Sequence, residues 1–304
     1  MGGGSFSYAD YTTYSNSVKS APVEHIYTSV GIDPSLDPKG VKIRESRDSA
    51  DNPNSTPVIV ALDVTGSMNI IAETIAKEGL GTLFKGILDR KPVTDPHLMF
   101  MGVGDADCDR APLQVSQFEA DNRIVDQLTR IYLENGGGGN SHESYDFPWY
   151  FAAKHTEHDS LIKRGKRGYL FTIGDEETPN GLTQDQINKF LGYRPQVGYP
   201  SAMSLEEARR KYEVFHVVIE QGDYASRYLD RVKTAWTKLL GQHTIFLSDY
   251  NALAETIVSA IQVAEGVDAS TAAKGWKSPA TEKIVGRAVS SLPRGVPAPK
   301  MLGR

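Results

Sequence analysis

Five consecutive apolar residues, Val58-Ile59-Val60-Ala61-Leu62, give the strongest strand signal in the sequence. A continuous apolar run of this length is typical of a strand buried on both faces of a parallel sheet. Similar runs recur at residues 97–103, 113–118, 168–173, 212–219 and 243–247. Because helix-like stretches separate most of them, the sequence predicts an α/β, Rossmann-like doubly wound fold, with a mostly parallel six-stranded sheet and helices on both faces.

One pair of these strands should run antiparallel. Residues 104–112 join the runs 97–103 and 113–118 and leave no room for a crossover helix. A connection this short favours a hairpin. We therefore expect one antiparallel strand at an edge of the sheet.

Two local patterns predict where helices lie. Apolar residues recur at helical spacing over residues 71–87, which predicts one long helix after the first strand. Thr183 with Gln186, and Ser204 with Glu207, have the spacing of capping boxes. Each pair predicts the start of a short helix.

Composition divides the chain into three parts. Residues 1–56 form an N-terminal arm rich in Gly, Ser, Tyr, Pro and Asp, residues 57–264 carry the alternating pattern, and residues 265–304 form a basic, proline-containing C-terminal tail. Seven basic and three acidic residues give the tail a net charge of +4. Two interpretations of the tail stay open: a flexible, solubilising end, or a basic peptide that docks on an acidic partner.

Charge and cysteine content narrow the classes of function. The 304 residues include 33 Lys and Arg against 38 Asp and Glu, a net charge of -5, which offers no cationic surface to nucleic acid. The single cysteine, Cys108, cannot close an intramolecular disulfide, so a reducing compartment such as the cytoplasm is expected. No apolar run approaches the roughly 20 residues of a membrane span, and we expect no membrane partner.

Oxygen-rich loops follow two of the strands and the glycine run. In an open parallel sheet, functional residues gather beyond the carboxyl ends of the strands. The loops concerned are 63–67, 139–143 and 174–177. Their candidate metal ligands are Asp63, Thr65, Ser67, Asn140, Ser141 and Asp175. Oxygen ligands of this kind suit hard cations, so we expect one divalent cation, Mg²⁺ first, with Mn²⁺ and Ca²⁺ as alternatives.

Further carboxylates surround these loops. Asp105, Asp107 and Asp109 alternate in the edge hairpin, at the same end of the sheet, and lack the Gly and distal Glu of a calcium loop. Together with Glu143 and Glu176, we interpret them as a solvated acidic rim that faces the partner. Such a rim would raise the affinity for a cation or select a basic partner.

These residues give the sequence a resemblance to von Willebrand factor A domains with a metal-ion-dependent adhesion site. The first loop of that family reads Asp-x-Ser-x-Ser, and Asp63, Thr65 and Ser67 match it with a Thr in the middle position. The third loop of the family supplies an Asp followed by Gly, where this chain has Asp175 followed by Glu176. The resemblance covers the middle part of the chain.

The second loop departs further from the family pattern. In the family it supplies a Thr, or an Asp in versions that read Gly-Gly-Gly-Asp-x-x-Glu. Here Asn140 aligns with the Asp and Glu143 with the Glu, and Ser141 is an alternative ligand. The choice between Asn140 and Ser141 stays open.

The resemblance also implies a function. In the family, the metal keeps an open coordination position that a carboxylate of a partner protein completes, so the domain is a switchable protein-binding module rather than an enzyme. Asp63 and Asp175 would hold or orient the cation, in part through water, while Thr65 and Ser67 would coordinate it. The first five residues, Met1-Gly2-Gly3-Gly4-Ser5, together with residues 36–40 and 44–48, resemble uncharacterised bacterial and phage proteins, which adds a phage particle to the cytoplasm as an expected location.

Two other functions compete with this one. The first is a structural component of a larger particle, in which the arm and tail make the assembly contacts. The second is a Mg²⁺-dependent phosphotransferase of the haloacid-dehalogenase-like type, in which Asp63 would attack phosphorus. Against it, Met68 leads directly into the predicted helix and leaves no room for the small flap of those enzymes. Asp63 and Ser67 could also simply cap that helix, and Asp175 could simply form a turn.

Overall fold

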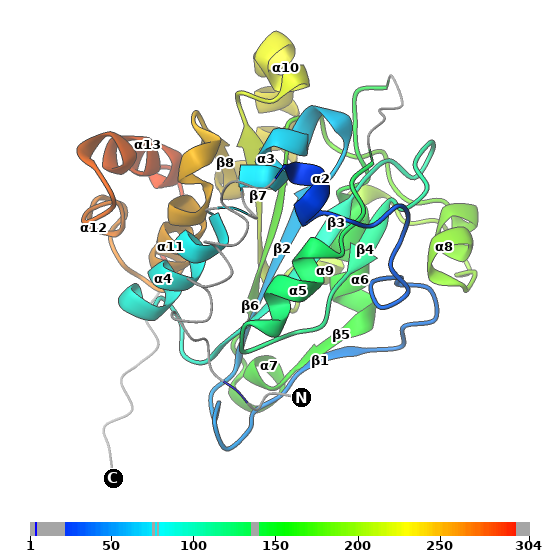
Figure 1. Ribbon diagram of the computed structural model, residues 1–304, viewed down its shortest axis with the longest axis horizontal. Coiled ribbons are helices and arrows are strands. Elements are labelled where there is room, and N and C mark those ends of the chain that lie inside the picture. The colour runs from blue at the N-terminus through cyan, green and yellow to red at the C-terminus, as the bar shows by residue number, and fades with distance from the viewer. Residues whose placement is uncertain (1–3, 5–21, 75–76, 78, 135–139, 296–304) are drawn as a thin grey trace.

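The computed structural model describes residue 4 and residues 22–74, 77, 79–134 and 140–295 (Figure 1). Within these ranges, the side chains of residues 23, 24, 67, 69, 70, 72, 80, 81 and 84 are not described. The glycine run at 136–139 and most of the first five residues, which the sequence analysis singled out, therefore lie outside the described residues.

Six strands form the central sheet. They are β2 (Thr56–Asp63), β3 (Pro96–Val103), β4 (Leu113–Val115), β6 (Gly168–Gly174), β7 (Tyr212–Ile219) and β8 (Thr244–Leu247). Their spatial order is β4-β3-β2-β6-β7-β8, and every pair is parallel except β3 with β4. This confirms the predicted α/β class, the mostly parallel six-stranded sheet and the antiparallel edge strand.

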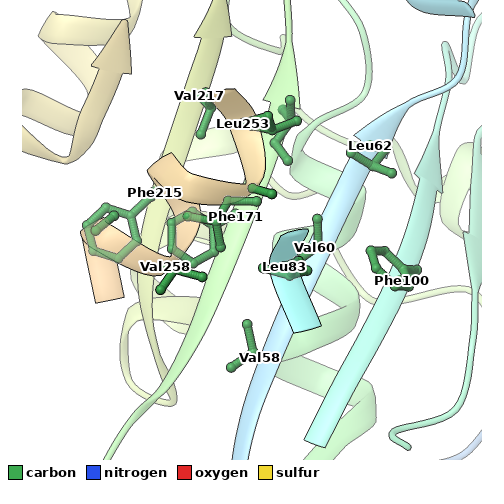
Figure 2. Packing of buried hydrophobic residues seen from close by; sticks show 14 of the residues in the cluster. Val58, Val60, Leu62, Leu83, Phe100, Phe171, Phe215, Val217, Leu253 and Val258 are labelled. Atoms are coloured by element: carbon green, nitrogen blue, oxygen red, sulfur yellow. The ribbon is translucent and has the colours of Figure 1, made fainter. Parts of the chain in front are cut away.

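The apolar run of β2 divides the core into two layers. All eight residues of β2 are buried, because the strand pairs with β3 on one side and with β6 on the other. Val58, Val60 and Leu62 point to one face, where they pack with residues of the neighbouring strands and helices, as Figure 2 shows. Ile59 and Ala61 point to the opposite face and belong to a second cluster. Alternate side chains of one strand therefore pack against helices on opposite faces of the sheet.

Helices cover both faces of the sheet. Residues of α4 (Leu80–Arg90), α5 (Arg123–Thr129), α11 (Leu253–Ala264) and α13 (Pro279–Val289) pack in the first cluster. Residues of α6 (Asp146–His155), α8 (Gln184–Leu191), α9 (Ser201–Arg209) and α10 (Asp223–Leu240) pack in the second. Figure 1 shows α4 and α11 on one side of the sheet and α6 and α8 on the other.

Shorter elements complete the described chain. They are α2 (Val23–Ile26), β1 (Arg44–Ser46), η1 (Gly66–Met68), α3 (Asn69–Thr74), β5 (Thr156–His158), α7 (Asp159–Arg164), η3 (Gly241–His243), η4 (Tyr250–Ala252) and α12 (Ala269–Ala272). β1 and β5 pair in parallel as a separate two-stranded sheet. In the described part of the chain, no helix has the length and hydropathy of a membrane span.

The terminal parts join the fold where they are described. In the N-terminal arm, β1 pairs with β5, the side chain of Leu36 is buried in the core, and β2 already begins at Thr56. In the tail, α13 packs on α11 and buries Val285 and Val289. Apolar residues at 285, 288, 289 and 292 recur at helical spacing, which explains this packing. The interpretation of the tail as a flexible end is wrong over these residues.

Two predicted helices differ from the structure. The helix expected over residues 71–87 is described as two helices, α3 and α4, with residues 75, 76 and 78 outside the described part. Thr183 and Gln186 form the predicted capping box of α8. Ser204 does not begin a helix, because α9 starts at Ser201 after the extended Pro200 and encloses Ser204 as a buried residue.

Candidate metal centre

Two carboxylates stand where adjacent central strands end. Asp63 is the last residue of β2, and Asp175 follows the last residue of the neighbouring β6. Asp63 is 1% exposed and Asp175 is fully buried. The parallel register of the two strands therefore brings these predicted ligands to the same buried place at one end of the sheet.

Both carboxylate oxygens of Asp63 accept hydrogen bonds. Its Oδ1 accepts from the backbone N of Thr65 at 2.9 Å and from Thr65 Oγ1 at 2.6 Å. Its Oδ2 accepts from the hydroxyl of Tyr145 at 2.8 Å. These bonds fix the orientation of the carboxylate.

Two glycines make space for these contacts. A Cβ on Gly174 would lie 1.9 Å from the hydroxyl oxygen of Tyr145. A Cβ on Gly222 would lie 2.1 Å from Cβ of Asp175. The first turn of α10, which follows Gly222, also supplies the backbone N of Tyr224, which donates to Oδ2 of Asp175 at 2.8 Å. Any larger residue at either glycine would displace a carboxylate or its partner.

The carboxylates of the site repel one another. Burial, and next the charge of Asp175, raise the pKa of Asp63. Burial, and next the charge of Asp63, raise the pKa of Glu143, and burial with Asp63 and Asp175 raises the pKa of Glu176 to about 8. The charged neighbours that act most strongly on these three groups are all carboxylates. The described residues thus gather carboxyl groups in a region of low dielectric constant, where each group disfavours the charged form of the others.

Two carboxylate oxygens in this region lack a hydrogen-bond donor. Glu143 is 2% exposed, and its buried Oε2 has no partner among the described residues. The buried Oε2 of Glu176 also has none there. A buried unpaired carboxylate oxygen is costly. A cation at this place would compensate both the unpaired oxygens and the mutual repulsion, so the donor set fits a hard divalent ion.

The second loop makes different contacts from those expected of a metal ligand. The amide nitrogen of Asn140 donates to Oδ2 of Asp105, which directs the Asn140 side chain toward the edge hairpin. The backbone carbonyl of Ser141 accepts from the backbone N of Glu177 at 3.0 Å. Ser67 lies in η1, and its side chain is not among those described. The ligand roles of these three residues stay predictions.

Three of the five carboxylates of the predicted acidic rim are buried rather than solvated, which corrects the sequence interpretation. Asp105, Asp109 and Glu143 are buried, and Asp107 alone among the hairpin aspartates is exposed. Asp109 Oδ2 accepts from the backbone N of Asp105 at 2.7 Å, and Asp105 Oδ1 accepts from the backbone N of Asp107 at 2.9 Å. The carboxylates of Asp105 and Asp109 turn inward because they accept hydrogen bonds from backbone N–H groups of their own loop. Glu176 is partly exposed.

Several contributors to the site carried no sequence signal. Tyr145 lies fully buried just before α6, between Asp63 and the ring of Trp236, whose centroid is 5.6 Å away. Trp236 in turn donates its indole N–H to the carbonyl of Glu176 at 2.8 Å. These residues come from segments far apart in the sequence. No local pattern links them to the strand-end loops.

A purely acidic or thiol-imidazole centre is not present in the described part of the chain. There, no group of three or more His, Cys, Asp or Glu side chains is arranged to hold a metal ion. The predicted ligand set combines two carboxylates with hydroxyl oxygens from residues 65 and 67. The predicted site therefore differs in type from a centre made only of acidic, thiol or imidazole groups.

Comparison with protein-family models and with curated proteins gives no match. Similar solved structures include the pilus adhesin SpaC from Lactobacillus rhamnosus GG in its open conformation, with a TM-score of 0.45, 12% identity, and coverage of 74% of this chain and 31% of that one. A von Willebrand factor type A protein from Catenulispora acidiphila gives a TM-score of 0.41 and 13% identity, over 70% of this chain and 43% of that one.

A third similar structure is the proximal thread matrix protein 1 of the mussel byssus. Its TM-score is 0.42 at 12% identity, over 73% of this chain and 48% of that one. This chain thus matches less than half the length of each of these three proteins. At such identities the likeness concerns the fold alone.

Proposed function

We propose that this chain is a protein-binding module that depends on one divalent cation, bound where β2 and β6 end. The observation that carries the proposal is the buried carboxylate group of Asp63, Asp175 and Glu143. The charged groups that act most strongly on Asp63 and Glu143 are carboxylates, and Oε2 of Glu143 has no hydrogen-bond donor in the described structure.

The proposed ligands come from two buried turns and one loop. Asp63 and Asp175 supply the negative charge, while the hydroxyls of Thr65 and Ser67 supply neutral oxygens. Asn140 or Ser141 completes the protein ligands. Mg²⁺ is the first choice, with Mn²⁺ and Ca²⁺ as alternatives, since all three prefer oxygen ligands.

The cation would recognise an acidic group of a partner protein. Two carboxylate ligands balance a divalent ion, and neutral hydroxyl ligands leave its charge available to a third carboxylate. A carboxylate from the partner would complete the coordination at the mouth of the site. Binding of the partner would then require the cation.

Calorimetric titration with Mg²⁺, Mn²⁺ and Ca²⁺, together with thermal unfolding, tests the proposal. A cation at about 100 times its Kd stabilises the folded state by about 2.7 kcal/mol, which raises Tm by roughly 5 to 10 °C for a domain of this size. Asp63→Asn and Asp175→Asn should abolish this rise. Asp185→Asn is the matched control, because the side chain of Asp185 is 82% exposed and pairs with Arg194. Wild-type protein that binds none of the three ions would refute the proposal.

A further inference from the structure

A second site lies at the opposite end of the sheet. A pocket of about 370 Å³ opens at the amino-terminal ends of β6, β7 and β8. It is lined by Arg167, which precedes β6, by Glu213 and Phe215 of β7, and by His243, which precedes β8. Because β6 has seven residues, the pocket and the candidate metal centre are separated by about 20 Å.

Three arginines and a single carboxylate line this pocket. Arg167, Arg209 and Arg294 line it together with Glu213. Glu213 is already shared, because it pairs with Arg167 through one oxygen and lies 3.6 Å from Nε2 of His243 through the other. The pocket therefore has an excess of positive charge, although the chain as a whole is acidic.

Two of the arginines form no ion pair within the described part of the chain. The guanidinium of Arg209 forms no hydrogen bond or ion pair with any residue that the structure describes. The backbone carbonyl of Arg209 accepts a hydrogen bond of 3.2 Å from the guanidinium of Arg167. Arg294 donates its Nε to the carbonyl of Gly266 at 2.6 Å and forms no ion pair within the described chain. Burial lowers the pKa of Arg209; the charge of Glu213 opposes this shift, and the charge of Arg167 adds to it. An anion in the pocket would relieve this repulsion.

The shape and chemistry of the pocket select a class of anion. Guanidinium groups match the oxygens of a phosphate with paired N–H donors. Two arginines that form no ion pair within the described chain balance the two negative charges of a phosphate. A volume of about 370 Å³ also lies within the range of small-molecule sites. Phe215 and Pro293 supply an apolar wall that an organic part could contact.

We infer that this pocket binds the phosphate group of a small molecule, with Arg209 and Arg294 as its principal ligands. Free phosphate and a phosphate ester share this chemistry. The site is independent of the proposed cation, because its residues lie at the other end of the strands.

Isothermal titration in the presence of EDTA tests the inference without any divalent ion. The probes are inorganic phosphate, AMP and, as an uncharged control, adenosine. Wild-type protein should bind at least one phosphate probe saturably and should not bind adenosine. Tighter binding of AMP than of phosphate identifies an ester as the ligand class, and the reverse identifies free phosphate.

Arg209→Gln and Arg294→Gln should each weaken binding of the phosphate probe by about tenfold or more, since a charge-assisted hydrogen bond is lost. Arg210→Gln is the matched control, because Arg210 is the next residue and its side chain is 72% exposed. Circular dichroism confirms that each variant is folded. The inference is overturned if wild-type protein binds neither phosphate probe, if both Gln variants bind like wild type, or if Arg210→Gln weakens binding equally.

Discussion

The hydroxyl of Tyr145 donates a hydrogen bond of 2.8 Å to Oδ2 of Asp63, although 82 residues separate the two in sequence. Tyr145 is fully buried and reaches Asp63 over Gly174, where a side chain would collide with the hydroxyl. The contact therefore connects the segment before α6 with the end of β2. It holds one oxygen of the carboxylate that the proposed cation needs.

Replacing Tyr145 by Phe should weaken the cation site and the fold together. The variant leaves Oδ2 of Asp63 without a donor, which costs about 1–3 kcal/mol of unfolding free energy. Loss of an orienting group beside a metal ligand typically weakens metal affinity by about 10-fold or more. Urea unfolding and Mg²⁺ titration measure the two effects. Tyr228→Phe, at an exposed position of α10, is the control, and equal behaviour of both variants would argue against a role for Tyr145.

The pH dependence of stability should show the raised pKa of Glu176. Its pKa rises from 4.5 in the unfolded chain to about 8 in the folded protein, chiefly through burial. The folded state thus binds the proton more tightly, so this contribution to stability is complete below pH 4.5 and is lost as the pH rises toward 8.

We expect, in EDTA, that the difference in Tm between Glu176→Gln and wild type grows in favour of the variant as the pH rises from 5 to 8. The comparison removes the titration of groups on which Glu176 does not act, such as the buried His216. Saturating Mg²⁺ should shrink the difference, because the cation compensates the charge. A difference that is constant over this pH range would show that Glu176 titrates normally.

Adding a methyl group at Gly222 should disturb Asp175. The Cβ of Gly222→Ala would meet Cβ of Asp175 at 2.1 Å, so the backbone or the carboxylate must move. Overpacking of this kind costs about 1–3 kcal/mol, and the displaced ligand should reduce cation affinity. Gly31→Ala is the control, since no atom lies within 4 Å of the added Cβ. Denaturant unfolding and calorimetry of both variants check the prediction, which fails if Gly222→Ala behaves like Gly31→Ala.

The packing of α13 should contribute to the stability of the whole domain. Val285 is fully buried against α11, and Val285→Ala removes buried methyl groups at a cost of about 2 kcal/mol. Val30→Ala should cost nothing measurable, since Val30 is 94% exposed. Chemical denaturation measures both. A single shifted transition for Val285→Ala would show that the tail unfolds with the sheet, whereas an unchanged midpoint would show that α13 is dispensable.

The sheet was predictable because a strand that is buried on both faces needs a continuous run of apolar residues, which is visible in the sequence. The run 58–62 has to be apolar throughout when strands flank it on both sides and helices cover both faces, and the short link 104–112 excludes a crossover. The placement of Asp63 and Asp175 at one end followed from parallel topology, since Asp63 ends β2 and Asp175 directly follows β6.

The remaining contacts were not predictable because they depend on tertiary packing. Tyr145 meets Asp63 through a non-local contact, and nothing near Asp105 or Asp109 indicates that their own loop would bury them. Ser204 and Glu207 have the spacing of a capping box, but α9 begins about one turn earlier, directly after Pro200. In the tail, proline and basic residues obscured an amphipathic pattern of four apolar positions.

A crystal structure of the protein with Mn²⁺, recorded at an X-ray wavelength where manganese scatters anomalously, tests the central claim most directly. The account predicts one anomalous peak between Asp63 and Asp175, with the hydroxyl oxygen of Thr65 or Ser67 within about 2.5 Å of it. Anomalous density only elsewhere on the molecule, or none at all at saturating Mn²⁺, would contradict a cation site at the ends of β2 and β6.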